Sequence, residues 1–433
     1  MKSTRMALFG LLSILIPLLT APSPVESQTS RKFVAYYTEW GVYDRKYVPA
    51  DIPAAKLTHI NYAFIKPSDT NADGLYECAI ADAWAAKQKT MMRLVPGTNT
   101  AAGEDKGTLN QLRRLRTWRK DNGQTLPLLF SIGAYSMRDR FSAIASSSSH
   151  RQHFVNSCIQ LMQQESFDGI DLDWEYPRST ETASHRALLQ QFRDALTALG
   201  NNPRTGAPYL LTIAGPPDEY HLDPYDVAGI ALIVDWVNVM AYNFHGCWGM
   251  DHTGHNAPLR SSSSDPDGVD FSTQGGVQMW IDRGMPAGKI VLGLAYYGKA
   301  FQALSGSGPN PSYPGRFATI DPAQNDSPNC AMGSWGSTTS GDLDYWDVVQ
   351  RYVNLNGYTR YWDVEQEVPF LWKDAASYWI TYDDPDSIST KVHWARNMGL
   401  GGVFAWELAL ESHPDAAPKV YPLTNAAAGC LNP

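Results

Sequence analysis

The sequence has no run of basic residues, and its 44 acidic residues outnumber 35 basic ones, giving a formal net charge of −9. Proteins that bind nucleic acid need a concentrated basic surface, so this balance argues against a nucleic-acid partner. Long apolar runs are also scarce. The most apolar run covers residues 7–19, and no other segment is long and apolar enough to be considered as a membrane span. We therefore expect a protein that neither spans a membrane nor binds nucleic acid.

The apolar run of residues 7–19 follows a basic start that contains Lys2 and Arg5. It is too short and too close to the N-terminus for a typical membrane span. Ser27 is one of two small residues after it that can mark a cleavage site. The pattern predicts a secretory signal peptide over residues 1–27 and an extracellular mature chain.

The chain has only five cysteines, namely Cys78, Cys158, Cys247, Cys330 and Cys430. An oxidising compartment would allow up to two disulfides and leave one thiol, and the sequence does not determine the pairing. The cysteine spacing matches no zinc pattern. Cys158 lies in a helical pattern, where we expect a small buried residue. The histidines, among them His59 and His245, show no metal-ligand spacing either, so the sequence predicts no metal and no cofactor.

Eight short runs are rich in β-branched and aromatic residues. They are residues 32–40, 56–65, 126–133, 167–175, 209–215, 233–242, 289–298 and 400–408. Several intervening segments have helical periodicity, including one from Phe154 to Leu161 with Ser149 as a plausible N-cap. Strands that alternate with helices predict a parallel sheet, and eight repeats favour a closed (β/α)8 TIM barrel of the α/β class. A doubly wound open sheet is the alternative, but no glycine-rich phosphate loop follows the first strand.

About 70 residues separate the seventh predicted strand from the last helix and strand, too many for a loop without secondary structure. This stretch contains a helical segment and two alternating aromatic runs. We therefore expect an inserted α+β subdomain over residues 301–372. The barrel would occupy residues 28–300 and resume over residues 373–433, which include the C-terminal tail.

Three carboxylates alternate along the fourth predicted strand. With the two-residue period of a strand, Asp171, Asp173 and Glu175 share one face, and three apolar side chains share the other. Burying adjacent acids is costly because each ionisation raises the next pKa. A structural role would need arginine or metal partners, and an alternating strand is poorly shaped for calcium. The C-terminal end of a barrel strand is where catalytic residues are expected.

The segment that carries these acids, with the spacing Asp168-x-x-Asp-x-Asp-x-Glu175, resembles the D-x-x-D-x-D-x-E signature of glycoside hydrolase family 18. Residues 130–134 resemble its S-x-G-G segment, with Ala134 in place of the last glycine. Residues 240–243 resemble its M-x-Y-D segment, with Asn243 in place of aspartate. Residues 401–406, in the eighth run, resemble the family's eighth-strand segment that contains a tryptophan, here Trp406. The similarity extends from about residue 32 to residue 410, and the insertion resembles that of the deep-groove chitinases.

The resemblance implies a chitinase that retains configuration through substrate-assisted catalysis, one of the exceptions to the two-carboxylate scheme. Glu175 would protonate the glycosidic oxygen, and Asp173 would orient the substrate's acetamido group. Asp171 would share a proton with Asp173. Tyr242 would donate to the acetamido oxygen, and Trp406 would form the floor under the sugar that is cleaved.

Other residues at strand ends are expected to contact sugars. They are Tyr36, Trp40, Tyr135, Met240, Asn243, Trp248 and Tyr297, with Lys299 as a further candidate. The expected partners are chitin and chito-oligosaccharides, bound by a monomer. Two alternatives stay open: a non-catalytic, lectin-like chitin binder, and an endo-β-N-acetylglucosaminidase that acts on N-glycans. The first typically lacks the terminal acid, which is present here.

Overall fold

A computed structural model describes most of residues 31–431. Within that range the description leaves out residues 134, 269–270, 305–309, 328–329 and 336–339. The predicted signal peptide and Ala134 therefore lie outside the described residues. In the part of the chain that is described, no helix is long and apolar enough to cross a membrane.

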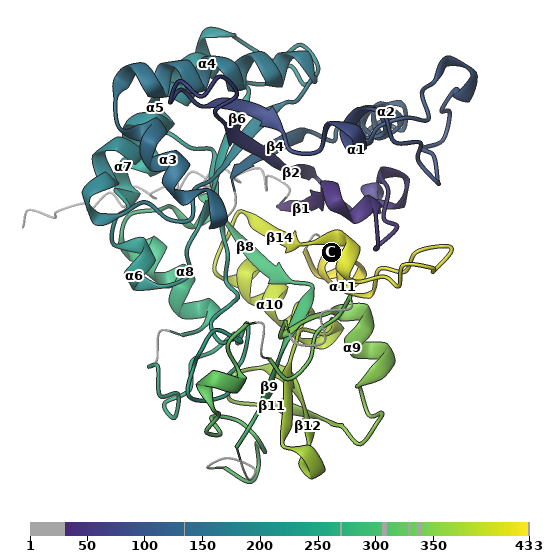
Figure 1. Ribbon diagram of the computed structural model, residues 1–433, viewed down its shortest axis with the longest axis vertical. Coiled ribbons are helices and arrows are strands. Elements are labelled where there is room, and N and C mark those ends of the chain that lie inside the picture. The colour runs from purple at the N-terminus through teal and green to yellow at the C-terminus, as the bar shows by residue number, and fades with distance from the viewer. Residues whose placement is uncertain are drawn as a thin grey trace, which may run out of the picture. The chain divides into compact units, whose positions relative to one another are not determined.

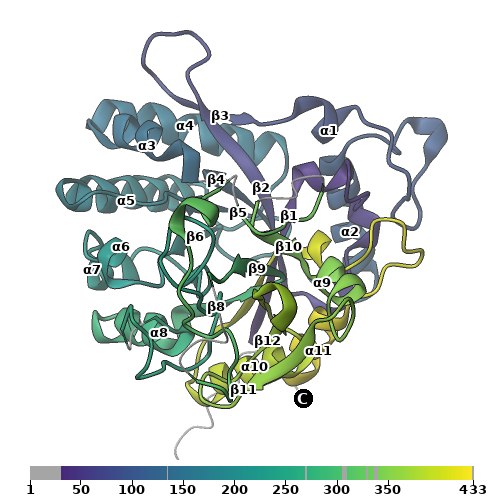
Figure 2. The ribbon, with the colours of Figure 1, turned by 60° about the horizontal axis from the view of Figure 1, so that its bottom comes forward.

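Eight parallel strands form a closed barrel, because β1 pairs both with β2 and with β14 (Figures 1 and 2). They are β1 (Lys32–Thr38), β2 (His59–Ser68), β4 (Leu128–Gly133), β5 (Gly169–Asp173), β6 (Leu210–Gly215), β7 (Trp236–Val239), β8 (Ile290–Ala295) and β14 (Gly402–Trp406). A further strand, β3 (Glu77–Ile80), pairs in antiparallel orientation with the C-terminal part of β2. One strand lies in each of the eight predicted runs, so the predicted TIM barrel is confirmed.

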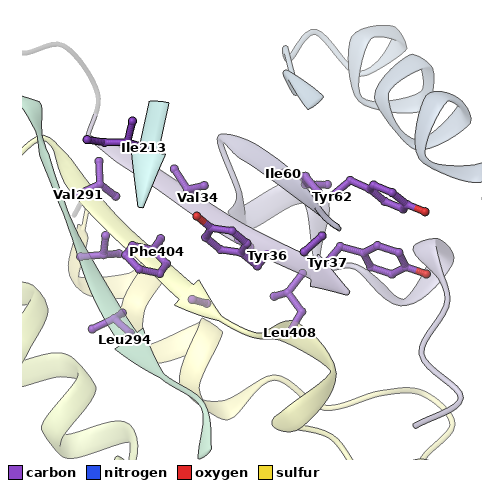
Figure 3. Close-up of a cluster of buried hydrophobic side chains, with 14 of the residues drawn as sticks. Val34, Tyr36, Tyr37, Ile60, Tyr62, Ile213, Val291, Leu294, Phe404 and Leu408 are labelled. Atoms are coloured by element: carbon purple, nitrogen blue, oxygen red, sulfur yellow. The ribbon is translucent and has the colours of Figure 1, made fainter. Parts of the chain in front are cut away.

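The barrel strands are buried on both faces, as expected of parallel strands that are covered by helices. Figure 3 shows part of this core, in which Val34 and Val291 lie on the side of the Tyr36 and Phe404 rings and Ile60 lies beside Tyr62. Branched side chains of this kind pack well on a pleated surface, which explains why the strand prediction from composition succeeded.

Helices surround the barrel (Figure 2). They are α1 (Ala83–Lys87), α2 (Thr108–Asp121), α3 (Arg138–Ala145), α4 (Ser148–Gln164), α5 (Thr182–Ala198), α6 (Glu219–Leu222), α7 (Val227–Ala231), α8 (Thr273–Asp282), α10 (Pro385–Asn397) and α11 (Pro422–Leu431). The N-cap of α4 is Ser147, whose hydroxyl accepts a hydrogen bond from the His150 N–H, and not Ser149. A cap needs an extended backbone, which Ser147 has, whereas Ser149 is already in the first turn.

The segment between β8 and α10 in the sequence forms a second, antiparallel sheet, with the strand order β10-β9-β13-β12-β11. Its strands are β9 (Tyr297–Gln302), β10 (Asp342–Asp344), β11 (Thr359–Asp363), β12 (Val368–Lys373) and β13 (Tyr378–Thr381), and α9 (Tyr345–Arg351) accompanies them. The sheet extends beyond residues 301–372 at both ends. The reason is that β9 begins two residues after β8 ends, so the chain passes from one sheet into the other without a loop.

Two disulfides join distant segments. One links Cys78 on β3 to Cys158 on α4, and the other links Cys247 to Cys330, while Cys430 is free. Cys158 is buried, as expected, but it is also covalently paired. A single helical pattern cannot reveal this, because its partner lies on a strand 80 residues away.

Candidate active site

A cleft lies at the C-terminal ends of the barrel strands, the usual place for the active site of this fold. It consists of two adjoining cavities of 690 and 320 Å³. Both are in the size range of small-molecule sites. Five residues line both cavities, so the two form one continuous cleft. These are Tyr135, Glu175, Met240, Tyr242 and Asn243.

Asp171 lies inside the barrel below this cleft and is fully buried. Four side chains from four other strands donate hydrogen bonds to its carboxylate. They are Tyr36 (2.7 Å), Ser131 (2.6 Å), Thr212 (2.5 Å) and Asn238 (3.1 Å). Burial raises the pKa of Asp171 and these hydrogen bonds oppose the rise. Both oxygens are occupied by donors, so this residue holds the polar interior of the barrel in place.

Gly133 at the end of β4 allows β5 to approach closely beside the acids. Its φ is +136°, and a Cβ at this position would lie 2.0 Å from the carbonyl oxygen of Asp173. No other residue fits such a contact without moving the backbone. The glycine therefore fixes the position of Asp173 relative to the neighbouring strand.

Asp173 and Glu175 form a pair of hydrogen-bonded carboxyl groups in the cleft. Burial, together with the charges of Glu175 and Asp171, raises the pKa of Asp173 well above its usual range. Burial also raises the pKa of Glu175 from 4.5 to about 7, although hydrogen bonds with Tyr176 and Asp173 oppose the rise. Two acids of this kind cannot both ionise cheaply, so one proton stays between them near neutral pH.

The expected sharing of a proton between Asp171 and Asp173 stays a prediction, and the hydrogen bond between Asp173 and Glu175 is a further contact that the sequence did not predict. The carboxylate of Asp171 already accepts four hydrogen bonds, whereas Oδ1 of Asp173 is buried and has no hydrogen-bond partner among the described residues. On its cleft side Asp173 interacts with Glu175.

Asp168, the first acid of the motif, lies at the opposite end of β5. It accepts hydrogen bonds from Asn202, Arg116 and Arg204. Burial alone would raise the pKa of Asp168, but these partners outweigh it and lower the pKa. The residue ties the N-terminal end of the strand to its neighbours and does not reach the cleft.

Aromatic side chains line the cleft on either side of Glu175. Trp406 stacks on Phe64, with ring centroids 5.8 Å apart, and both line the smaller cavity. Trp40 lines the same cavity and is 42% exposed. Tyr135 and Trp248 line the larger cavity and are 73% and 45% exposed. Flat, exposed rings of this kind offer apolar surface to a ligand.

Among the other predicted residues, Tyr297 and Lys299 are buried and Asn243 is exposed in the cleft. The Tyr297 hydroxyl donates to Oδ1 of Asn243 at 2.7 Å, and the ring is almost fully buried. Asn243 has a φ of +61°, which asparagine tolerates better than most residues. Lys299 forms an ion pair of 2.5 Å with Asp342 and lies 5.4 Å from the centroid of the Trp248 ring.

The family comparison agrees with this geometry. The model of the family described as glycosyl hydrolases family 18 matches residues 32–411. The chain belongs to glycosyl hydrolase family 18. The matched range covers all eight barrel strands and the whole second sheet, and it therefore includes the residues that line the cleft.

Known relatives and solved structures resemble this family 18 chain over most of its length. Chitinase A1 of Niallia circulans is 33% identical over 92% of this chain, which spans 59% of that relative's length. The structure of chitinase ChiA74 from Bacillus thuringiensis has a TM-score of 0.79 at 29% identity, and the match covers 93% of this chain and 70% of the other. Human YKL-39, described as a pseudo-chitinase with retained chitooligosaccharide binding, has a TM-score of 0.74 at 25% identity over 93% of this chain and its own whole chain.

Several lining residues of this family 18 cleft were missed by sequence reasoning. Those are Phe64, Tyr176, Ala214, Pro217, Asp218, Tyr220, His221, Phe244 and Phe271. The group at 217–221 directly follows β6, so its position at the C-terminal end of a barrel strand was an available signal. Phe271 lies about thirty residues after β7, at the far end of a long loop, and no local pattern marks it.

Proposed function

We propose that this protein is a secreted chitinase that hydrolyses β-1,4-linked N-acetylglucosamine polymers with retention of configuration. The observation that carries the proposal is the carboxyl pair Asp173–Glu175 in the cleft, in which Glu175 has a pKa of about 7. A glycosidase acid must hold its proton near neutral pH, and burial beside another acid is one way to achieve this. Secretion is supported by the N-terminal pattern and by two disulfides.

In the proposed reaction Glu175 protonates the glycosidic oxygen as the bond to the anomeric carbon breaks. The acetamido oxygen of the same sugar attacks that carbon and forms a cyclic oxazolinium ion. Glu175, now ionised, takes a proton from water, and the water opens the ring on the face that the leaving group occupied. The proton from water restores the protonated form of Glu175. The configuration is retained because two inversions have occurred.

In this reaction the acetamido N–H needs a hydrogen-bond acceptor, and the acetamido oxygen needs a donor. Oδ1 of Asp173 is buried and has no partner in the described structure, so an acetamido N–H would supply the donor that this oxygen lacks. The ring of Tyr242 lines both cavities beside Glu175, where its hydroxyl would donate to the acetamido oxygen. Fixing the group in this way aligns the nucleophile with the anomeric carbon.

The exposed rings on both sides of Glu175 support a polymeric substrate. Trp406 would lie under the sugar that is cleaved, and Trp40 and Trp248 would stack on sugars further away in opposite directions. Successive sugars of a uniform chain present the same apolar faces, so repeated flat rings suit such a ligand. The insertion contributes one wall through its contacts with Trp248.

A non-catalytic chitin binder is the second candidate, favoured by the similarity to the pseudo-chitinase YKL-39. Glu175 and both aspartates are present in this chain, which favours the enzyme. A third reading is an endo-β-N-acetylglucosaminidase that acts on the chitobiose core of N-glycans.

Incubation with chitohexaose and, separately, with a high-mannose glycoprotein distinguishes the three. A chitinase cleaves the hexamer, and NMR of the fresh products shows the β-anomer first if configuration is retained. Binding without cleavage would indicate the lectin-like protein, and release of glycans alone would indicate the glycan hydrolase. A thiazoline analogue of the cyclic intermediate should inhibit competitively. Trapping a stable covalent sugar on any side chain would refute the substrate-assisted route.

A further inference from the structure

Four side chains in the loop between β7 and α8 converge on one point outside the catalytic pair. They are His245, His252, Asp265 and Asp267. One nitrogen or oxygen atom from each lies within 4.8 Å of those of the other three. The side chains of His245 and Asp265 are almost fully buried, and that of Asp267 is 31% exposed. The two ends of the loop therefore meet at a buried cluster of two imidazoles and two carboxylates.

Hydrogen bonds fix which nitrogen of each imidazole faces the cluster. Nδ1 of His245 lies 3.1 Å from the carbonyl oxygen of His255, and Nδ1 of His252 lies 2.7 Å from Oδ1 of Asp251. Both oxygens only accept, so both Nδ1 atoms carry the proton. In a neutral ring the lone pair is then on Nε2, which points at the carboxylates. Metal-binding histidines are oriented in this way by an oxygen behind the ring.

The Nε2 atoms have no hydrogen-bond partner among the described residues. Nε2 of His245 lies 3.4 Å from Asp265 and 3.3 Å from Asp267, and Nε2 of His252 lies 3.3 Å from Asp267. These distances are longer than ordinary hydrogen bonds. Ligand atoms at 2.0–2.1 Å from a tetrahedral zinc ion lie about 3.3–3.4 Å from one another. Three of the six separations between the ligand atoms thus match the edges of a zinc tetrahedron, and the other three are no longer than 4.8 Å. Two carboxylates balance the charge of a divalent cation.

The surroundings favour a permanent, structural site. The rings of Phe271 and Phe317 lie 5.8 and 6.4 Å from the ring of His245 and shield it from water. Gly254 makes room for the imidazole, because a Cβ there would lie 2.2 Å from it. Phe271 also lines the larger cavity, so whatever fixes His245 also supports one wall of the cleft.

We propose that His245, His252, Asp265 and Asp267 form a zinc site that fastens the β7–α8 loop and steadies the wall of the cleft around Phe271. Two imidazoles and two carboxylates suit zinc, whereas calcium and magnesium prefer sets of six or more oxygens. Four protein ligands leave no open position, so the ion would be structural. Spacing did not predict the site, because the ligands follow no zinc pattern and meet only when the loop folds back on itself.

The test measures metal binding directly and does not depend on the proposed chitinase activity. The full chain is dialysed against a chelator, titrated with Zn²⁺, and analysed by calorimetry and elemental analysis. We expect about one zinc ion per chain and a rise in Tm with added zinc, because a ligand that binds only the folded state stabilises it. Co²⁺ in place of zinc should give the strong visible bands of tetrahedral cobalt.

Two ligand variants and two matched controls complete the test. Asp267→Asn and His252→Gln should weaken zinc binding at least ~100-fold, since each removes a ligand. Asp223→Asn and His393→Gln change an exposed aspartate and an exposed histidine elsewhere and should bind zinc as the wild type does. The proposal is overturned if the metal-free wild type takes up no zinc, or if both ligand variants bind it as tightly. A weak, octahedral cobalt spectrum of the wild type would also overturn it, even if a variant failed to fold.

Discussion

Raising the pH above 7 should abolish the proposed activity by removing the proton from Glu175, the group that we propose as the acid for the leaving group. Burial raises the pKa of this carboxyl from 4.5 to about 7. At pH 6 an acid with a pKa of 7 is about 90% protonated, whereas one with a pKa of 4.5 is about 3% protonated. The environment of Glu175 therefore increases the active fraction about 30-fold at pH 6, by the same relation.

The assay is kcat/KM on one soluble chito-oligosaccharide over a range of pH. The alkaline limb should bend near pH 7 and then fall about tenfold for each further pH unit, as for a single essential acid. Glu175→Gln keeps the shape of the side chain but has no proton to give, so its activity should be at least ~100-fold lower at every pH. A limb that bends near pH 4.5, or a variant that keeps more than a tenth of wild-type turnover, would refute the reasoning.

Glu175→Gln should lower the activity, but at alkaline pH it should raise the free energy of unfolding. Glu175 has a higher pKa in the folded state, so its favourable contribution is complete below pH 4.5 and is lost as the pH rises through about 7. Above that pH, the buried negative charge of Glu175 destabilises the folded wild type, and Glu175→Gln has no such charge. The shift of the pKa corresponds to at most about 3 kcal/mol. Urea unfolding at pH 8 should therefore show the variant to be the more stable protein, and an equal loss of stability at pH 5 and pH 8 would contradict this.

Three further changes test other parts of the site. Asn243→Asp adds a negative charge to the cleft, so the pKa of Glu175 and the alkaline limb should move up; a limb that stays or moves down would show that residue 243 does not tune the acid by charge. Tyr36→Phe removes one of four hydrogen bonds to the buried Asp171 and should lower the free energy of unfolding by about 1–3 kcal/mol in urea titrations. A change below about 0.5 kcal/mol would contradict the role assigned to that hydroxyl. Cys330→Ser opens a disulfide that spans 83 residues and should cost about 2–4 kcal/mol, measured as a lower Tm under oxidising conditions only; an equal loss with reductant present would point to packing instead.

Local patterns in the sequence were enough to predict the barrel and to place three acids on one face of a strand. Strand composition and spacing are local properties, and each of the eight predicted runs contains a barrel strand. Alternation along β5 is also local, and it placed Asp171, Asp173 and Glu175 on one face and Trp174 in the core beside Phe141. The predicted active-site position followed from the fold, because barrel strands present their C-terminal ends to the site.

The groups that these residues contact could not be predicted, because they come from segments that are distant in the sequence. Asp171 is surrounded by donors from four other strands, among them Tyr36 from the first and Asn238 from the sixth, and Asp173 is hydrogen-bonded to Glu175. The disulfide partners and the cluster around His245 likewise come from segments that approach only after the chain folds. Contacts of this kind depend on how loops and strands are placed in space, and no periodicity along the chain records them.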